Sequence, residues 1–126
     1  MNVSIQVLTA IYGAFTVKHF VADFILQSDE MSRGKQRLKG WLGPLVTHAA
    51  CHATLTLGLA LAVKPELWWL GFVDLTVHAA IDWCKVRVTH IFGLTNMCRT
   101  WWWATGADQA LHQLTHFAFV VALAAR

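Results

Sequence analysis

The chain has 126 residues, of which 56% are hydrophobic and only 13% are charged, and its formal net charge is +3. This composition excludes a disordered chain, a nucleic-acid tail and a disulfide-stapled secreted module. The length allows one domain, and the apolar excess favours a small integral membrane protein over an unusually apolar soluble helical bundle.

Four apolar segments each approach the ~20 residues that a helix needs to cross a bilayer. The first, Val3 to Leu26, lacks the basic start of a cleaved signal peptide. We expect helices at about 3–27, 45–63, 67–90 and 104–125. The sequence therefore predicts an all-α, polytopic membrane protein, in which residues 1–126 form a single antiparallel bundle of four transmembrane helices.

The charges between these segments predict their orientation. Residues 28–43 carry four basic residues and 85–103 carry three, whereas residues 64–66 form the short connection between the second and third segments. The positive-inside rule places the two longer connections in the cytoplasm. Both termini are then periplasmic, in a bacterial inner membrane. Tryptophans are expected to mark the outer interface at Trp68 and Trp69, and the inner interface at Trp41, Trp83 and Trp101–Trp103.

Histidine and aspartate recur at a spacing of four in every predicted helix, which places both side chains of a pair on one helix face. Six of the seven histidines have a histidine or aspartate four residues away, and the exception is His90. Chance would give one or two such histidines. The main pairs are His19/Asp23, His48/His52, His78/Asp82 and Asp108/His112.

Counting from the cytoplasmic end of each helix, these eight side chains fall into two layers, roughly 6 and 12 Å deep. An isolated Asp in a membrane helix costs up to about 3 kcal/mol, and a divalent metal would offset that cost. Imidazole and carboxylate ligands suit Zn, Mn or Fe, and eight ligands suggest two ions bridged by a carboxylate. The predicted metal ligands are His19, Asp23, His48, His52, His78, Asp82, Asp108 and His112.

Further polar residues are expected to assist this site. Asp23 or Asp108 is the candidate general base. Lys85 and Arg87 are candidates for holding an anionic head group, although ordinary positive-inside charge is the favoured explanation for both. Lys18 is left without a role. Four residues are expected to support the ligands, with Asp74 and His116 orienting His78 and His112: Asp74, His116, Gln27 and Gln109.

The three cysteines, Cys51, Cys84 and Cys98, form no CxxC motif and are expected to be small apolar core residues. A structural alternative also exists for the whole polar set. Buried His–Asp hydrogen bonds could simply join helices within the membrane.

The polar strings together resemble the DUF3307 family of small bacterial and phage membrane proteins, over roughly residues 10–120. The resemblance implies a polytopic helical protein and supplies no reaction. A weaker likeness, in architecture only, is to small membrane-bound metal-dependent hydrolases with His-rich helices. The strings are His19-x-x-Ala-Asp23-Phe-x-Leu-Gln27, His48-x3-His52, His78-x-x-Ile-Asp82-Trp-x-Lys85 and Asp108-Gln109-x-Leu-His112.

These observations favour a membrane-embedded, metal-dependent hydrolase that acts on a lipid or lipid-linked phosphate at the cytoplasmic leaflet. A di-iron-type membrane oxidoreductase would use the same ligands. A non-enzymatic metal carrier or a phage membrane interaction protein is the third alternative. The expected partners are the bilayer and a lipid phosphate, without nucleic acid, and a second copy of the chain is a candidate for sealing the polar face.

Overall fold

The computed structural model describes residues 4–125, which form helices and no strand, so the all-α prediction is confirmed. The expected start of the first helix at Val3 lies outside the described residues. The elements are α1 (Ile5–Phe20), the π-helix η1 (Val21–Leu26), α2 (Asp29–Gly34), α3 (Leu42–Val63), the 3-10 helix η2 (Pro65–Leu67), α4 (Leu70–Ile91) and α5 (Arg99–Ala124).

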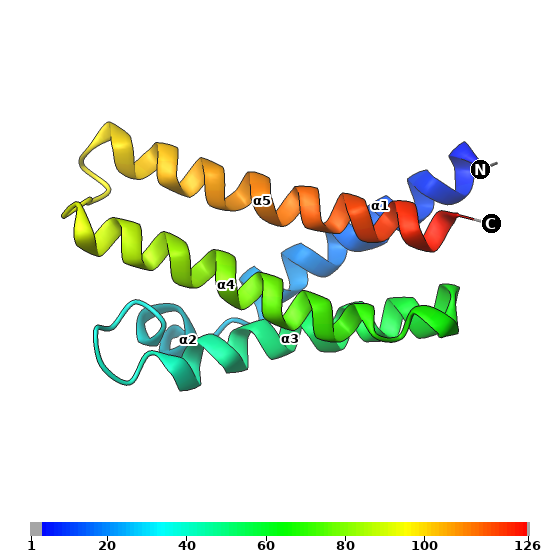
Figure 1. Ribbon diagram of the computed structural model, residues 1–126, viewed down its shortest axis with the longest axis horizontal. Coiled ribbons are helices and arrows are strands. Elements are labelled where there is room, and N and C mark those ends of the chain that lie inside the picture. The colour runs from blue at the N-terminus through cyan, green and yellow to red at the C-terminus, as the bar shows by residue number, and fades with distance from the viewer. Residues whose placement is uncertain (1–3, 126) are drawn as a thin grey trace.

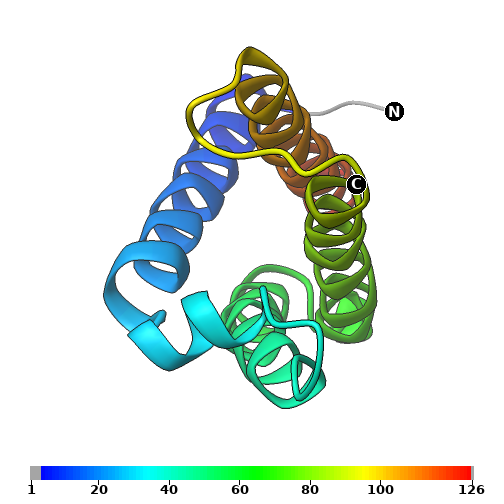
Figure 2. The same ribbon diagram turned by 90° about the vertical axis from the view of Figure 1, so that its left-hand side faces the viewer.

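The four long helices, α1, α3, α4 and α5, surround a common axis, as the end-on view in Figure 2 shows. α1 begins and α5 ends at the same end of the molecule, where η2 joins α3 to α4 (Figure 1). α2 and the connection from α4 to α5 lie at the opposite end, which we call the α2 end. Successive long helices therefore run antiparallel.

The α2 end differs from the expectation in its helix boundaries. Residues 28–43 were expected to be a loop, but they contain α2, whose N-cap Ser28 accepts a hydrogen bond from the Met31 backbone N–H at 3.2 Å. α3 begins at Leu42 rather than residue 45, and α5 at Arg99 rather than residue 104. The reason is that loss of hydropathy marks the end of an apolar segment, whereas the backbone continues as helix beyond it.

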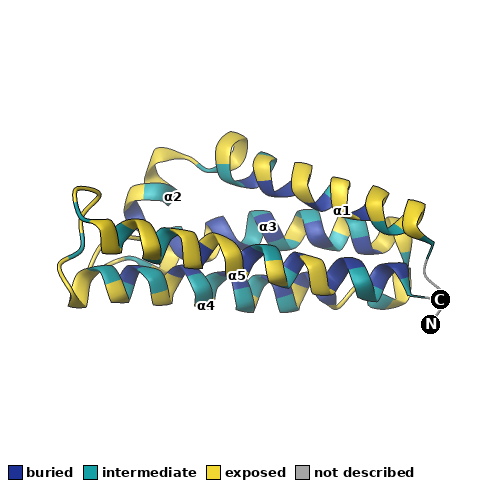
Figure 3. Ribbon diagram, turned by 90° about the horizontal axis from the view of Figure 1, so that it is seen from above, coloured by how far each residue is buried: buried dark blue, intermediate teal, exposed yellow. Residues whose placement is uncertain are grey.

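The distribution of apolar side chains is inverted relative to a soluble bundle. An apolar core that includes Phe15, Leu70 and Phe119 fills the end opposite α2, while buried positions elsewhere hold many polar side chains. Large apolar side chains such as Phe72 and Leu114 are exposed, and the buried faces of the helices point inward (Figure 3). This arrangement separates the polar residues from the outer surface.

Two stretches of the described chain, Ile5–Leu26 and Leu42–Val63, are long and apolar enough to cross a membrane. α4 and α5 carry more polar residues, and several of these are buried, among them Asp74, Asp82 and Asp108. The structure therefore shows a helical fold with two candidate spans, and a four-span bundle remains a prediction.

The cysteines do not lie in the core, so that expectation was wrong. Cys84 is exposed, Cys51 and Cys98 are half-buried, and all three are free thiols. Asp82 and Val86 of α4 are both buried, and their spacing of four directs both side chains inward. Cys84, midway between them, lies on the opposite side of the helix.

Gly34, at the end of α2, is buried against Pro44 of α3. A Cβ at Gly34 would lie 2.5 Å from Pro44 Cγ, and a proline ring has little freedom to move away. We expect Gly34→Ala to lower the free energy of unfolding by about 1–3 kcal/mol through overpacking, measured by denaturant titration in detergent. A Cβ at Gly43 meets nothing within 4 Å, so Gly43→Ala is a control expected to be neutral or slightly stabilising. Equal stability of the two variants would contradict the close contact.

Candidate metal centre

The structure brings the eight predicted metal ligands together inside the bundle, toward the α2 end. They come from η1 and all four long helices, and the five histidines among them are buried. The contacts join neighbouring helices: Asp23 of η1 reaches His52 of α3, and Asp82 of α4 reaches His112 of α5. The four pairs, which share a spacing of four residues and a similar distance from the helix ends, therefore form one cluster in the folded chain.

Asp23 is the carboxylate on which the N-terminal half of the cluster converges. Its Oδ1 lies 2.9 Å from His52 Nε2 and 3.4 Å from His48 Nε2, and its Oδ2 lies 3.1 Å from His19 Nε2. Asp23 lies on the π-helix η1, a backbone form that is rare and frequent at functional sites. Three imidazoles from two helices thus share one carboxylate.

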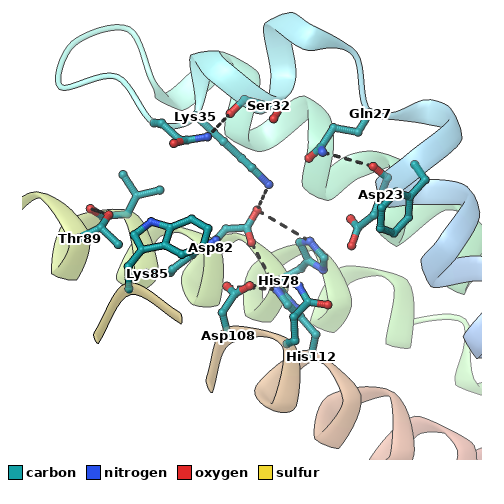
Figure 4. A pocket seen from close by; sticks show the side chains of 15 residues that line it. Asp23, Gln27, Ser32, Lys35, His78, Asp82, Lys85, Thr89, Asp108 and His112 are labelled. Atoms are coloured by element: carbon teal, nitrogen blue, oxygen red, sulfur yellow. Dashed lines mark hydrogen bonds and ion pairs between the residues drawn. The ribbon is translucent and has the colours of Figure 1, made fainter. Parts of the chain in front are cut away.

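Asp82 plays the corresponding part on α4. Its Oδ1 lies 3.3 Å from His112 Nε2, and its Oδ2 lies 3.6 Å from His48 Nε2. Lys35, which follows α2, reaches into the cluster and pairs with Asp82 Oδ2 at 2.7 Å (Figure 4). Sequence reasoning missed Lys35, because it stands in a basic run that was interpreted as a cytoplasmic loop.

His48 and His78 face each other with their Nε2 atoms 3.3 Å apart. The Nδ1 atoms of both rings are buried and have no hydrogen-bond partner in the structure, so the polar contacts of both rings are made at Nε2. Ligand atoms 2.0–2.1 Å from a tetrahedral ion lie about 3.3–3.4 Å from one another. The separations of His48 Nε2 from His78 Nε2 and from Asp23 Oδ1, 3.3 and 3.4 Å, fit that geometry.

Several combinations of these side chains have the compactness of a metal site. In each combination, every residue offers one ligand atom and all these atoms lie within 4.8 Å of one another. The arrangement is compatible with one or more ions of a metal whose identity the geometry does not specify. The three combinations are Asp23/His48/His52/His78, His78/Asp82/His112 and His19/His52/His116.

Asp74 and His116 were expected to orient His78 and His112, but they do not. Both contact Lys18, a residue that had been left without a role: Lys18 Nζ lies 2.8 Å from Asp74 Oδ2 and 3.2 Å from His116 Nε2. Asp74 Oδ2 also accepts a hydrogen bond from Thr56 Oγ1 at 2.6 Å. A buried ammonium group needs hydrogen-bond acceptors, and those of Lys18 include Asp74 and His116, which the spacing of four had paired with His78 and His112.

A pocket of about 230 Å³ lies over the cluster at the α2 end, between η1, α2, α4 and α5 (Figure 4). Lys35 and Lys85 both line this pocket. Arg87, the other candidate for holding an anionic head group, is not among the lining residues. Its guanidinium group lies 5.2 Å from the ring centroid of Trp41 and 5.4 Å from that of Trp83. The two cations of the pocket are therefore Lys35 and Lys85.

The two glutamines expected to support the ligands differ in what they contact. Gln109 Oε1 lies 3.4 Å from His19 Nε2, and Gln109 Nε2 donates to Asp108 Oδ2 at 3.2 Å, so Gln109 links two ionisable residues. Gln27 donates to the backbone oxygen of Asp23 rather than to its carboxylate. Asp108 Oδ1 is buried without a hydrogen-bond partner and lies 3.7 Å from His112 Nε2.

A family model described as "Protein of unknown function (DUF3307)" matches residues 11–125, so it covers every residue of this cluster. No curated protein and no solved structure matches the chain. The chemistry of the cluster therefore has to be inferred from its own geometry.

Proposed function

The chain belongs to the DUF3307 family, and since that family is described only as of unknown function, we propose the function from the centre itself. The protein is a membrane-embedded, metal-dependent hydrolase that acts on a lipid-linked phosphate. The observation that carries the proposal is the buried, negatively charged His/Asp cluster beneath a pocket lined by two lysines. The location in a membrane, the metal and the reaction are argued in turn below.

The inverted surface supports a membrane location. Apolar side chains face outward on α4 and α5 as well as on the two candidate spans, with Phe72, Ile91 and Leu114 each at least 60% exposed. A soluble protein rarely leaves so many large apolar side chains exposed on all its long helices. Trp68 and Trp69 at one end, and Trp102 and Trp103 at the other, fit the aromatic belts of a spanning bundle. We therefore propose that all four long helices span the membrane, with the start of α1 and the end of α5 on the periplasmic side.

The buried charge supports one divalent ion. The cluster holds four carboxylates but only two ammonium groups, Lys18 and Lys35, so its formal net charge is −2 when every histidine is counted as neutral. Uncompensated buried charge is strongly unfavourable, and one divalent cation would neutralise it. We propose His48, His78, Asp23 and Asp82 as its ligands, which replaces the two-ion prediction. The four carboxylates are those of Asp23, Asp74, Asp82 and Asp108.

The pocket supports phosphate hydrolysis. A divalent ion held by these residues would supply a nucleophile at neutral pH and would neutralise the charge that develops on a phosphoryl group. Lys35 and Lys85 line the same pocket and provide cations for the phosphate oxygens. Asp108 also lines it, with its buried Oδ1 free of hydrogen bonds, whereas Asp23 is engaged by three histidines. We therefore assign the general base to Asp108 rather than to Asp23.

An apolar groove supports a substrate with a hydrocarbon chain. The groove has a volume of about 590 Å³ and runs between α1 and α5, where Tyr12, Ala110 and Phe117 are among the lining residues. Gln109 lines the polar pocket and Ala110, the next residue, lines the groove, so both hollows border α5 near these two residues. A lipid phosphate with its head group at the lysines would place its chain in this groove.

The test is release of inorganic phosphate from a lipid phosphomonoester by detergent-purified protein supplied with Zn²⁺ or Mn²⁺. We expect turnover by the wild type, and a loss of about 10²- to 10⁴-fold in kcat for Asp108→Asn with the metal content unchanged. Asp29→Asn is the matched control, because Asp29 is exposed on α2. Equal turnover by Asp108→Asn and wild type would contradict the assignment of the base. No metal-dependent turnover of any lipid phosphate would contradict the hydrolase proposal.

A further inference from the structure

We propose that Lys18 is a tethered cation that occupies a second metal-binding position, formed by His19, His52 and His116, and so limits the centre to one ion. This inference concerns the deeper half of the cluster, and it goes beyond the metal site proposed at the pocket. Removal of the ammonium group should turn this position into a site for a divalent ion.

The three histidines form a set that is compact enough to hold an ion. Each offers one ring nitrogen, the three nitrogens lie within 4.8 Å of one another, and all three residues are buried. The ring centroid of His19 lies 5.5 Å from that of His52 and 5.2 Å from that of His116. Three histidines are a known ligand set for zinc.

Lys18 fills this position with a charge of its own. Lys18 Nζ lies 3.2 Å from His52 Nδ1, 3.2 Å from His116 Nε2 and 2.8 Å from Asp74 Oδ2. An ammonium group has three protons and no acceptor, so these three acceptors satisfy it completely. Lys18 is only 4% exposed, and Asp74 provides the counter-charge. Both histidines thus direct at Lys18 a ring nitrogen that removal of the ammonium group would leave free to bind a metal.

The same contacts determine the tautomer of His52. Because Lys18 can only donate, His52 Nδ1 is the acceptor, and the proton of the neutral ring is on Nε2. His52 Nε2 then donates to Asp23 Oδ1 at 2.9 Å. His52 is therefore a positioning residue that holds Asp23, rather than a metal ligand through Nε2. The chain Lys18–His52–Asp23 connects the deeper position to the metal ligands at the pocket.

The position of Lys18 explains why the cluster can contain more potential metal ligands than one ion needs. An ion in the deeper position would be separated from the pocket by His52 and Asp23, whereas an ion at His48 and His78 lies beneath it. With Lys18 in place, the deeper carboxylate Asp74 is neutralised and the remaining buried charge of −2 is concentrated near the pocket. The lysine thereby directs the ion to the position that a substrate can reach.

The experiment compares zinc stoichiometry between variants, by elemental analysis after equilibration with buffered Zn²⁺. We expect Lys18→Ala to bind one zinc ion per chain more than the wild type. Adding His116→Ala in the Lys18→Ala background should return the stoichiometry to the wild-type value. Lys39→Ala is the control, because Lys39 is exposed in the segment after α2 and should leave the stoichiometry unchanged.

Lys18→Ala leaves Asp74 without its partner, so a second variant guards against loss of folding. Lys18→Ala with Asp74→Asn keeps the buried charge balanced and retains the three histidines, and it should also gain one zinc ion. A folded variant of either kind with the wild-type stoichiometry would overturn the proposal. The measured quantity is the difference in zinc stoichiometry between variant and wild type, so this test does not depend on the proposed function. If the wild type binds no metal, the gain of one ion at the three histidines is still expected.

Discussion

Asp82→Asn is expected to lower the affinity for the divalent ion by at least about 100-fold. Loss of a residue that only hydrogen-bonds to a metal ligand already lowers metal affinity by up to about 100-fold, and loss of a ligand should cost at least as much. The carboxylate of Asp82, one of the four proposed ligands, lies 3.6 Å from His48 Nε2, and it also contacts His112 and Lys35. Asparagine keeps the shape but removes the charge, so the buried net charge falls from −2 to −1. The measurement is metal content of protein purified in detergent and dialysed against a buffered metal solution.

Asp29→Asn is the control for this variant, because its side chain is 95% exposed and its removal changes the net charge equally. Metal content near one ion per chain in both the wild type and Asp29→Asn supports a specific site. Substoichiometric metal in all three proteins would contradict the metal centre and favour a bundle joined by His–Asp hydrogen bonds. Tightly bound iron with a visible absorption band would instead support the oxidoreductase alternative.

Lys18→Ala is expected to lower the free energy of unfolding by about 3–5 kcal/mol, because it leaves the buried carboxylate of Asp74 without a partner. The Lys18–Asp74 pair is among the most deeply buried ion pairs of the described chain, with side chains 3% and 1% exposed. Adding Asp74→Asn removes the uncompensated charge, and Thr56 can still donate to the amide oxygen. The double variant should therefore recover most of the lost stability. Denaturant titration in detergent with a chelator present measures both effects.

The exposed Arg37–Glu30 pair provides the matched comparison for that measurement. Its side chains are 51% and 65% exposed, so water screens the interaction. We expect Arg37→Ala to change the stability by no more than about 1 kcal/mol. A small effect of Lys18→Ala, equal to that of Arg37→Ala, would contradict a buried and charged Lys18. Failure of Asp74→Asn to restore stability would indicate that Lys18 acts through the histidines instead.

The histidine and aspartate cluster was predictable because a helix converts sequence spacing directly into direction. A separation of four places His78 and Asp82 on one face of α4, and the same rule holds for Asp108 and His112 of α5. Alternating helix directions then bring pairs at equal depth to one level. Neither step requires knowledge of how the helices pack in detail.

The roles of the two lysines were not predictable, because a flexible side chain reaches beyond its own helix face. Lys18 is adjacent to His19, so spacing alone directs it away from the His19 face. Its four-carbon stem nevertheless brings the ammonium group to acceptors on α3, α4 and α5. Lys35 reaches Asp82 only because α2 folds back over the end of the bundle, where Gly34 contacts Pro44.

The sequence by itself determined the helical class, the family and the inward convergence of eight ionisable side chains, since these depend on local periodicity. Only the tertiary structure decided which partner each of these side chains contacts. It assigned Asp74 and His116 to Lys18, separated Arg87 from the pocket and placed Lys35 on Asp82. The physical reason is that partners within a buried cluster are chosen by charge and distance between helices, and the spacing within one helix does not specify those distances.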